Sequence, residues 1–445
     1  MKKEAVRLSD HFTYGRILRF ALPSIVMFVF TSIYTVVDGF FISNYAGKIP
    51  FAAVNLIMPF IMVLGTVGFM FGTGGAAIVS KTLGEGDPDR ARRYFSEIVE
   101  ANILFGLLLT VLGIAVMKPV SLFLGADDAM LPYCVLYGRL CVAGNTAFML
   151  QNVFQTFFVV AERPQLGLFF TVFSGVTNMV IDFLFVGVFK WGVAGAAAAT
   201  VMSQVVGGVL PIFYFAAKNS SQLRLKPARI EWRIIAKTAG NGSSELMSNI
   251  SSSIVSIAYN FQLLKFAGAN GVAAYGVLMY VCFIFVAIFI GYSVGTAPIV
   301  GYHYGAGNRA EMHNVLKMSL TVMGVFGVAM LAAAEVLAGP LAKMYVGYDA
   351  ELYALTVHAF RLFSFSFLVG GVNIYSSSFF TALNNGAISA AISFLRTLVF
   401  QLLAVLLLPL IFGLNGIWFA NLVADLGALC VTVYFLVSRR KKYGY

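Results

Sequence analysis

The sequence has few charged residues. Only 11% of its 445 residues are Asp, Glu, Lys or Arg, whereas 60% are hydrophobic. A soluble globular protein carries about 25% charged residues, so this chain has too few ionic groups to cover a water-exposed surface. Its 42 Phe and 20 Tyr residues also exclude an intrinsically disordered chain. The composition therefore predicts an integral membrane protein whose main partner is the lipid bilayer.

Cysteine, histidine and catalytic motifs are also scarce. The four cysteines lie in apolar stretches without CxxC spacing, so they predict neither a disulfide framework nor a zinc site. The four histidines are scattered, and no Ser-His-Asp or Walker pattern occurs. We therefore expect no metal centre, no cofactor and no enzymatic activity. A membrane-embedded enzyme is the alternative from a different class, and no residue set supports it.

Long apolar runs follow one another along the whole chain. A helix needs about 20 mostly apolar residues to cross the roughly 30 Å hydrocarbon layer. The runs predict an all-α protein with twelve membrane-spanning helices, at roughly residues 17–43, 51–80, 92–117, 130–160, 165–188, 193–217, 236–265, 271–302, 313–338, 352–382, 387–412 and 415–438.

Lys and Arg fall mostly on one side of this arrangement. With the N-terminus inside, only seven of the 30 lie outside, namely Lys48, Lys118, Arg139, Lys190, Lys265, Lys343 and Arg361. Cytoplasmic loops of membrane proteins carry the excess of Lys and Arg. We therefore expect both termini in the cytoplasm of a bacterial inner membrane. This placement explains the net charge of +11 without a nucleic-acid partner.

The two halves of the chain resemble each other at a displacement of 221 residues. The matching pairs include Ala46-Gly47 with Ala267-Gly268, Gly84-Glu85-Gly86-Asp87 with Gly305-Ala306-Gly307-Asn308, Phe158 with Phe379, and Gly195 with Gly416. Six spans per half predict two parallel six-helix lobes related by a pseudo-two-fold axis along the membrane normal. The expected division is a cytoplasmic N-terminal segment (1–16), N-lobe (17–217), linker (218–235), C-lobe (236–438) and cytoplasmic tail (439–445).

Three motifs connect this plan to a known family. "VVDGFFI" ends the first span, "LGEGDPDRARRYF" follows the second, and "YGAGNRAEMHNVL" follows the eighth. With the two-lobe plan, over roughly residues 14–438, they resemble the multidrug and toxic compound extrusion (MATE) family, in particular its bacterial MepA-type branch. The resemblance implies a monomeric, cation-coupled antiporter that exports cationic amphipathic drugs or toxic organic compounds by alternating access. A lipid-linked precursor flippase of the same architecture is the alternative.

Acidic residues inside the spans are functional candidates because buried charge is costly in a bilayer. Asp38 and Asp182 each lie 19 residues beyond a cytoplasmic arginine, Arg19 and Arg163, which places both about 28 Å from that side. Asn178 shares a helix face with Asp182, and Thr200 lies eight residues into the sixth span. These four residues predict one oxygen-rich site in the N-lobe.

The repeat partners of these positions include no acid, so the shared fold does not require the cluster. In the MATE resemblance, the four residues match the family's cation-coupling site. The group suits Na⁺, through its oxygen ligands, or H⁺, because burial and mutual repulsion favour a protonated carboxyl. The simpler alternative is that the acids only hold helices together by hydrogen bonds.

Further polar residues lie within the other spans. We expect four of them to line a substrate or cation cavity: Gln155, Asn152, Asn373 and Glu245. Arg396 and Asp425 both lie near mid-membrane, where they could form an ion pair or contribute to substrate binding.

Overall fold

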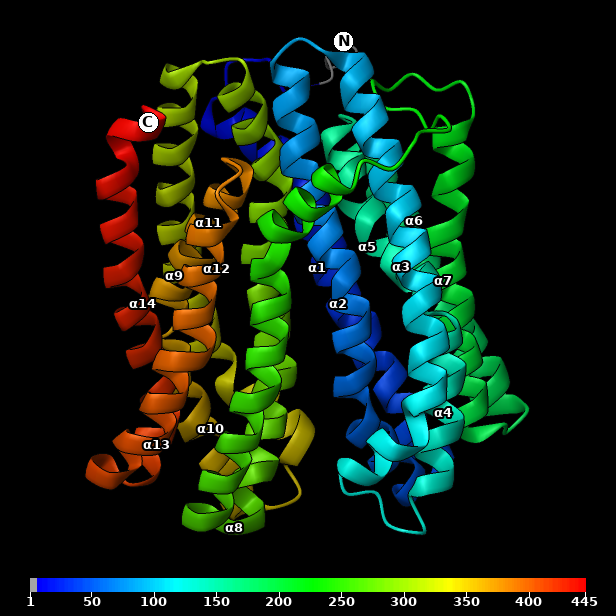
Figure 1. Cartoon of the computed structure of the whole chain (residues 1–445). Coiled ribbons are helices and arrows are strands. Elements are labelled where there is room, and N and C mark those ends of the chain that lie inside the picture. Colours follow the sequence, from blue (N-terminus) through cyan, green and yellow to red (C-terminus); the bar gives the residue numbers. More distant parts are fainter. Residues whose placement is uncertain (1–5) are drawn as a thin grey trace.

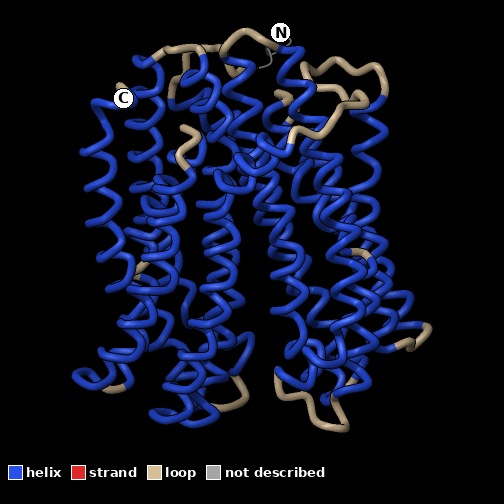
Figure 2. The backbone as a smooth tube through the Cα atoms, viewed as in Figure 1, coloured by secondary structure: helices blue, strands red, loops and turns tan. Residues whose placement is uncertain are grey.

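The computed structural model describes residues 6–445, apart from the side chains of Ser43, Asn44 and Lys48, and this part of the chain contains helices and loops but no strand (Figure 2). The first five residues of the expected N-terminal segment lie outside the described residues. The elements are α1 (Tyr14–Phe41), η1 (Ile42–Ala46), α2 (Lys48–Gly84), α3 (Pro88–Phe123), α4 (Leu131–Ala143), α5 (Asn145–Val160), α6 (Pro164–Asp182), η2 (Phe183–Val188), α7 (Gly192–Ala216), α8 (Trp232–Gly305), α9 (Arg309–Val346), α10 (Ala350–Ser364), α11 (Phe367–Ala382), α12 (Gly386–Phe394), η3 (Leu395–Phe400), α13 (Gln401–Phe412) and α14 (Leu414–Tyr443).

The helices make twelve spans, which confirms the predicted fold class. Nine helices of the described chain are long and apolar enough to cross a bilayer, and the pair α10–α11, bent by 50°, adds a tenth span. Helix α8 has 74 residues, about 110 Å at 1.5 Å per residue, and is broken at Gly268 (φ 58°, ψ −149°) into two spans. The consecutive helices α4 and α5, joined at Gly144, complete the twelve.

The spans form two lobes. Figure 1 shows α1–α7 grouped on one side of the molecule and α8–α14 on the other. The start of α1 and the end of α14 lie at the same end of the molecule, which we call the terminal end. The loop between α7 and α8 lies at this end too, so the basic linker and the basic C-terminal tail share it.

Two glycines bring the lobes together at the terminal end. A Cβ atom on Gly84 of α2 would lie 1.9 Å from the carbonyl oxygen of Tyr302 in α8, and one on Gly305 of α8 would lie 1.9 Å from the carbonyl oxygen of Lys81 in α2. Residues 84 and 305, like 81 and 302, are repeat partners at the 221-residue displacement. The repeat is therefore visible in space as a reciprocal contact, which only residues without a Cβ allow.

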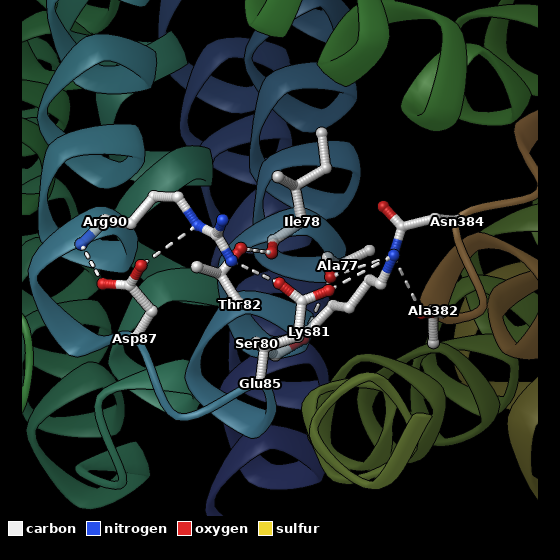
Figure 3. Close-up of polar contacts among 10 residues, drawn as sticks. All are labelled: Ala77, Ile78, Ser80, Lys81, Thr82, Glu85, Asp87, Arg90, Ala382 and Asn384. Atoms are coloured by element: carbon white, nitrogen blue, oxygen red, sulfur yellow. Dashed lines mark hydrogen bonds and ion pairs between the residues drawn. The ribbon is translucent and has the colours of Figure 1, made fainter. Parts of the chain in front are cut away.

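The contact between the lobes continues toward the middle of the spans. Gly74 of α2 packs against Thr238 in the first half of α8, and Gly295 in its second half packs against Ala21 of α1. The Asn384 side chain, from the loop after α11, donates a 3.2 Å hydrogen bond to the carbonyl oxygen of Ala77 (Figure 3). Every inter-lobe glycine contact of the described residues involves residues 21–25 or 70–84, so these contacts lie in the terminal half of the molecule.

The N-terminal segment crosses the same junction. The amide of Leu8 donates to the Glu162 carboxylate of the N-lobe at 2.7 Å, and the amide of Phe12 donates to the Glu311 carboxylate of the C-lobe at 2.9 Å. His11 Nδ1 lies 2.7 Å from the second Glu311 oxygen. Since Leu8 and Phe12 are both buried, this segment ties the lobes together at the terminal end.

Candidate functional site

The two predicted acids of the N-lobe lie between α1 and α6. A Cβ atom on Gly175 of α6 would lie 2.5 Å from the Phe30 ring and 2.8 Å from the Tyr34 ring, so this glycine lets α1 approach closely. One turn beyond Tyr34, the Asp38 carboxyl lies beside Asn178 and Asp182. The structure thus brings together three of the four residues predicted for this site.

Both carboxyl groups are buried without a compensating charge. Asp38 is 7% exposed and Asp182 is fully buried. Asp38 Oδ1 and both Asp182 oxygens have no hydrogen-bond partner, and neither residue has a basic partner among the described side chains. Two adjacent carboxylates in a buried site cannot both stay ionised without a cation. The site therefore requires a bound proton or a bound cation.

A π-helical segment follows each of the two acids in the chain. Asp182 is the last residue of α6 and directly precedes the π-helical segment η2, and Asp38 lies one turn before the π-helical segment η1. Segments with π-type hydrogen bonds are rare and frequently occur at functional sites. The backbone around both carboxyl groups is thus locally rearranged.

The neutral members of the predicted site differ in position. Asn178 is buried on the same face as Asp182, and its Oδ1 has no partner. Thr200 lies on α7, which packs against η2 where Gly195 meets Phe185. Its hydroxyl is buried and makes no hydrogen bond, so it is not joined directly to either acid.

Two further residues lie near this site and were not expected. Tyr137 of α4 is fully buried, its hydroxyl has no partner, and it lies within electrostatic range of Asp38 and Asp182. Gln151 of α5 lies near Tyr34 and is 3.5 Å from the Ser174 hydroxyl. The available signal was the pair of amides at 151 and 155, one turn apart in an apolar span.

The predicted cavity amides are buried in the lobes. Gln155 donates to the Thr171 hydroxyl at 3.3 Å, and Asn152 is 3% exposed with an unpaired Nδ2. The amide of Asn373 is fully engaged, because it donates to the backbone oxygen of Asp425 at 2.9 Å and accepts from Thr432 at 2.9 Å. Asn373 therefore joins α11 to α14.

The remaining candidate residues, Glu245, Arg396 and Asp425, are ionic and lie in the C-lobe. Arg396 Nη1, in η3, lies 3.9 Å from Asp425 Oδ1, in α14. Glu245 of α8, half-buried, lies within electrostatic range of Arg396. At the repeat position of Asp38 stands Tyr259, whose buried hydroxyl is unpaired. The structure thus shows acids at this depth in the N-lobe and a tyrosine in the C-lobe.

These features define a class of protein. Twelve spans in two parallel lobes that meet at one end, with uncompensated carboxyl groups buried between spans, describe a multi-pass membrane transporter. The sequence profile of the MatE family matches the chain twice, over residues 23–184 and 246–407. The chain belongs to the MatE family, and it is a transporter, not an enzyme. The two matches, one in each lobe, agree with the internal repeat.

Known relatives cover almost the whole chain. The multidrug export protein MepA of Staphylococcus haemolyticus (strain JCSC1435) is 21% identical over 432 residues, which are 96% of this chain and 94% of the relative. MepA of Staphylococcus aureus (strain MSSA476) is 21% identical over 426 residues, 95% of this chain and 93% of the relative. The resemblance to the MepA-type branch is thereby confirmed.

Solved structures share the fold. A MATE transporter in complex with MaL6 superimposes with a TM-score of 0.93 at 20% identity, with complete coverage of both chains. The outward-facing conformation of a multidrug resistance MATE family transporter of the MOP superfamily also gives a TM-score of 0.93 at 20% identity, covering 100% of this chain and 99% of that one. These matches establish the two-lobe architecture.

Proposed function

We propose that this protein is a cation-coupled antiporter that exports cationic amphipathic drugs or other toxic organic compounds by alternating access. The export of drugs is supported by the relatives, which are named multidrug export proteins. The terminal end, which carries the basic linker and tail, faces the cytoplasm in this proposal. No cofactor is needed beyond the coupling ion, and one chain contains both lobes and acts as a monomer.

The observation that carries the proposal is the adjacent, uncompensated pair Asp38 and Asp182. With neither ion nor proton, the pair would hold two buried negative charges, which is unfavourable. Binding of an incoming cation removes this repulsion and changes the packing between α1 and α6. An ion gradient therefore supplies the free energy that favours one arrangement of these helices over the other.

The lobe contacts support the alternating-access part. The lobes are joined at the terminal end by the reciprocal contacts of Gly84 and Gly305. If this end is cytoplasmic, the structure represents a state closed to the cytoplasm. Rocking of the lobes must break these contacts to admit substrate from the cytoplasm.

The coupling ion is H⁺ or Na⁺. One proton shared by Asp38 and Asp182 suffices to remove the repulsion between them. A Na⁺ ion would use the same carboxyl oxygens together with the unpaired Oδ1 of Asn178. The carboxyl pair favours H⁺, because a proton needs no further ligand.

A lipid-linked precursor flippase has less support. Such a transporter requires a basic cleft for a pyrophosphate group, whereas Arg396 lies beside Asp425 and within electrostatic range of Glu245. This region thus has two acids, Glu245 and Asp425, and one base, Arg396, which is unfavourable for binding a pyrophosphate group.

Drug-susceptibility assays in an efflux-deficient bacterial host test the proposal. The wild-type protein is expected to raise resistance to several organic cations, and Asp38→Asn is expected to abolish that resistance at equal expression. Asp89→Asn is the matched control, because Asp89 is 83% exposed and contacts only Arg92 on its own helix. No gain of resistance to any compound of a broad cation panel would refute the proposed export.

A further inference from the structure

A groove lies between the end of α3 and the start of α4, at the end of the molecule opposite the terminal end. Its volume is about 430 Å³. It is lined by two bases, Lys118 and Arg139, and by five apolar residues of α4, among them Val135 and Leu136. In Figure 1, α2 lies between this part of the N-lobe and the C-lobe. The groove is therefore separate from the junction of the lobes, and it combines a basic part with an apolar wall.

Close packing of α3 against α4 places the two bases next to each other. A Cβ atom on Gly138 of α4 would lie 2.4 Å from the sulfur of Met117 in α3, which is fully buried. Lys118 and Arg139 directly follow these two residues in the chain. Each base thus lies beside the contact on its own helix, and both side chains are exposed.

Neither base has a partner within the protein. Among the described residues, Lys118 and Arg139 form no ion pair, no hydrogen bond and no contact with an aromatic ring. The loop between the two helices contains Asp127 and Asp128, but the Asp127 carboxylate accepts the amide of Met130 at 2.8 Å instead. Charged side chains in spans normally pair with one another or face the bundle interior. These two bases do neither, so their counter-charge must come from outside the chain.

The depth of the bases matches the edge of the hydrocarbon layer. Arg139 is eight residues into α4 and Lys118 is five residues before the end of α3, which places them about 12 and 8 Å along these helices from the connecting loop. Long basic side chains at such depths extend toward the interface. The phosphate groups of a phospholipid lie at this level.

An apolar strip continues from the groove toward the middle of the membrane. Lys118, Val111 and Leu104 follow one another at seven-residue spacing on one face of α3. Val111 and Leu104 are 66% and 48% exposed. The strip is about 21 Å long at 1.5 Å per residue, which is enough to cross one leaflet of about 15 Å. An acyl chain can therefore lie along it.

The shared fold does not require the two bases. Their repeat partners are Gly339 in α9 and Phe360 in α10, and neither is charged. Only seven of the 30 Lys and Arg residues are expected on the outer side, and two of the seven line this one groove. The pair is thus a local feature of the N-lobe.

We propose that this groove binds an anionic phospholipid, whose phosphodiester contacts Lys118 and Arg139 and whose acyl chain lies along α4 and the exposed face of α3. The phosphodiester supplies the counter-charge that the chain lacks. A zwitterionic lipid offers less, because its cationic group approaches the same two bases. A free phosphate would leave the apolar wall uncovered. Basic pockets between spans bind anionic head groups in this manner.

Native mass spectrometry of the purified full-length protein in detergent tests the proposal, because it resolves protein that carries a single lipid. Phosphatidylglycerol and phosphatidylcholine with identical acyl chains are the probes. The wild-type protein is expected to bind phosphatidylglycerol more tightly. Loss of one base weakens the attraction of an anionic lipid about fivefold. Lys118→Gln and Arg139→Gln should therefore each raise the Kd of phosphatidylglycerol about fivefold, and the double variant about 25-fold, while the Kd of phosphatidylcholine stays within about twofold.

Lys343→Gln is the matched control. Lys343 is an exposed base in the last turn of α9, outside the groove, and it forms no ion pair among the described residues. This variant should leave both Kd values within about twofold of the wild-type values. The exposed, unpaired positions of Lys118 and Arg139 predict that their variants fold, and an unchanged melting temperature checks this.

Three results would overturn the inference. The first is equal wild-type affinity for the two lipids, a comparison that needs no variant. The second is a double variant that binds phosphatidylglycerol as tightly as Lys343→Gln does. The third is displacement of phosphatidylglycerol by inorganic phosphate at the same concentration, which would assign the bases to a free anion. A dimer that the double variant dissociates would likewise contradict the proposal, because a second copy of the chain would then cover the groove.

Discussion

The reciprocal glycine contact predicts a way to open the terminal end selectively. In Gly305→Ala, the new Cβ would lie 1.9 Å from the Lys81 carbonyl oxygen, where ordinary contact begins at 3.4 Å. Because both atoms belong to helices, α2 and α8 must separate by about 1.5 Å at this point. Gly84→Ala has the same effect against Tyr302.

The expected shift in the conformational equilibrium follows from the free-energy cost of overpacking. Extra methyl groups in a packed contact cost about 1–3 kcal/mol, which shifts a conformational equilibrium by roughly 5–150-fold. The cost applies only to the state in which the lobes touch at the terminal end. Gly305→Ala should therefore depopulate that state without unfolding either lobe.

Distances between spin labels across the terminal end measure this shift. Labels at Asp89→Cys on α3 and Lys317→Cys on α9 report on the two lobes, and both positions are exposed. The exposed Cys430 must first be replaced by serine. Gly305→Ala should add a population at longer distance. Gly324→Ala, which meets nothing within 4 Å, should not, and identical distributions for both variants would refute the reasoning.

Two other contacts give shorter tests. Arg396→Asp and Asp425→Arg should each lower the melting temperature in detergent, and the double reversal should recover part of the loss because the residues are paired; a double variant no better than the worse single one would contradict the pairing. Glu311→Ala removes the acceptor of the Phe12 amide and should speed hydrogen exchange at that amide, whereas unchanged exchange would show that the carboxylate does not hold the N-terminal segment.

Sequence patterns were sufficient to predict the architecture. Each span requires a long apolar run, and the 221-residue repeat indicates two lobes of the same fold. They were insufficient where a span is interrupted without loss of hydropathy. The single run predicted at 130–160 is divided at Gly144, and the run at 352–382 bends by 50° between α10 and α11. Packing against neighbouring helices determines where such bends occur, and the hydropathy of a run does not depend on that packing. The position of a bend therefore cannot be predicted from the apolar run.

The candidate site likewise contains residues that the sequence could predict and residues that depend on how the spans pack. Asp38 and Asp182 were identifiable because an acid in an apolar span is rare, and counting residues from Arg19 and Arg163 gave both acids the same expected depth. Tyr137 was missed because tyrosines are common in this chain and only the tertiary structure places this one near the acids. The proximity of Glu245 to Arg396 likewise depends on how two distant spans pack.

Gradient-driven transport in reconstituted vesicles tests the central claim most directly. Vesicles that contain the wild-type protein are given either a pH gradient or a Na⁺ gradient, and rhodamine 123 movement is followed. One of the two gradients should drive transport by the wild-type protein. The Asp38→Asn, Asp182→Asn double variant should bind the dye yet lose gradient-driven transport, because it keeps the side-chain volumes but has no ionisable group in the site. Full gradient-driven transport by this double variant would contradict the account.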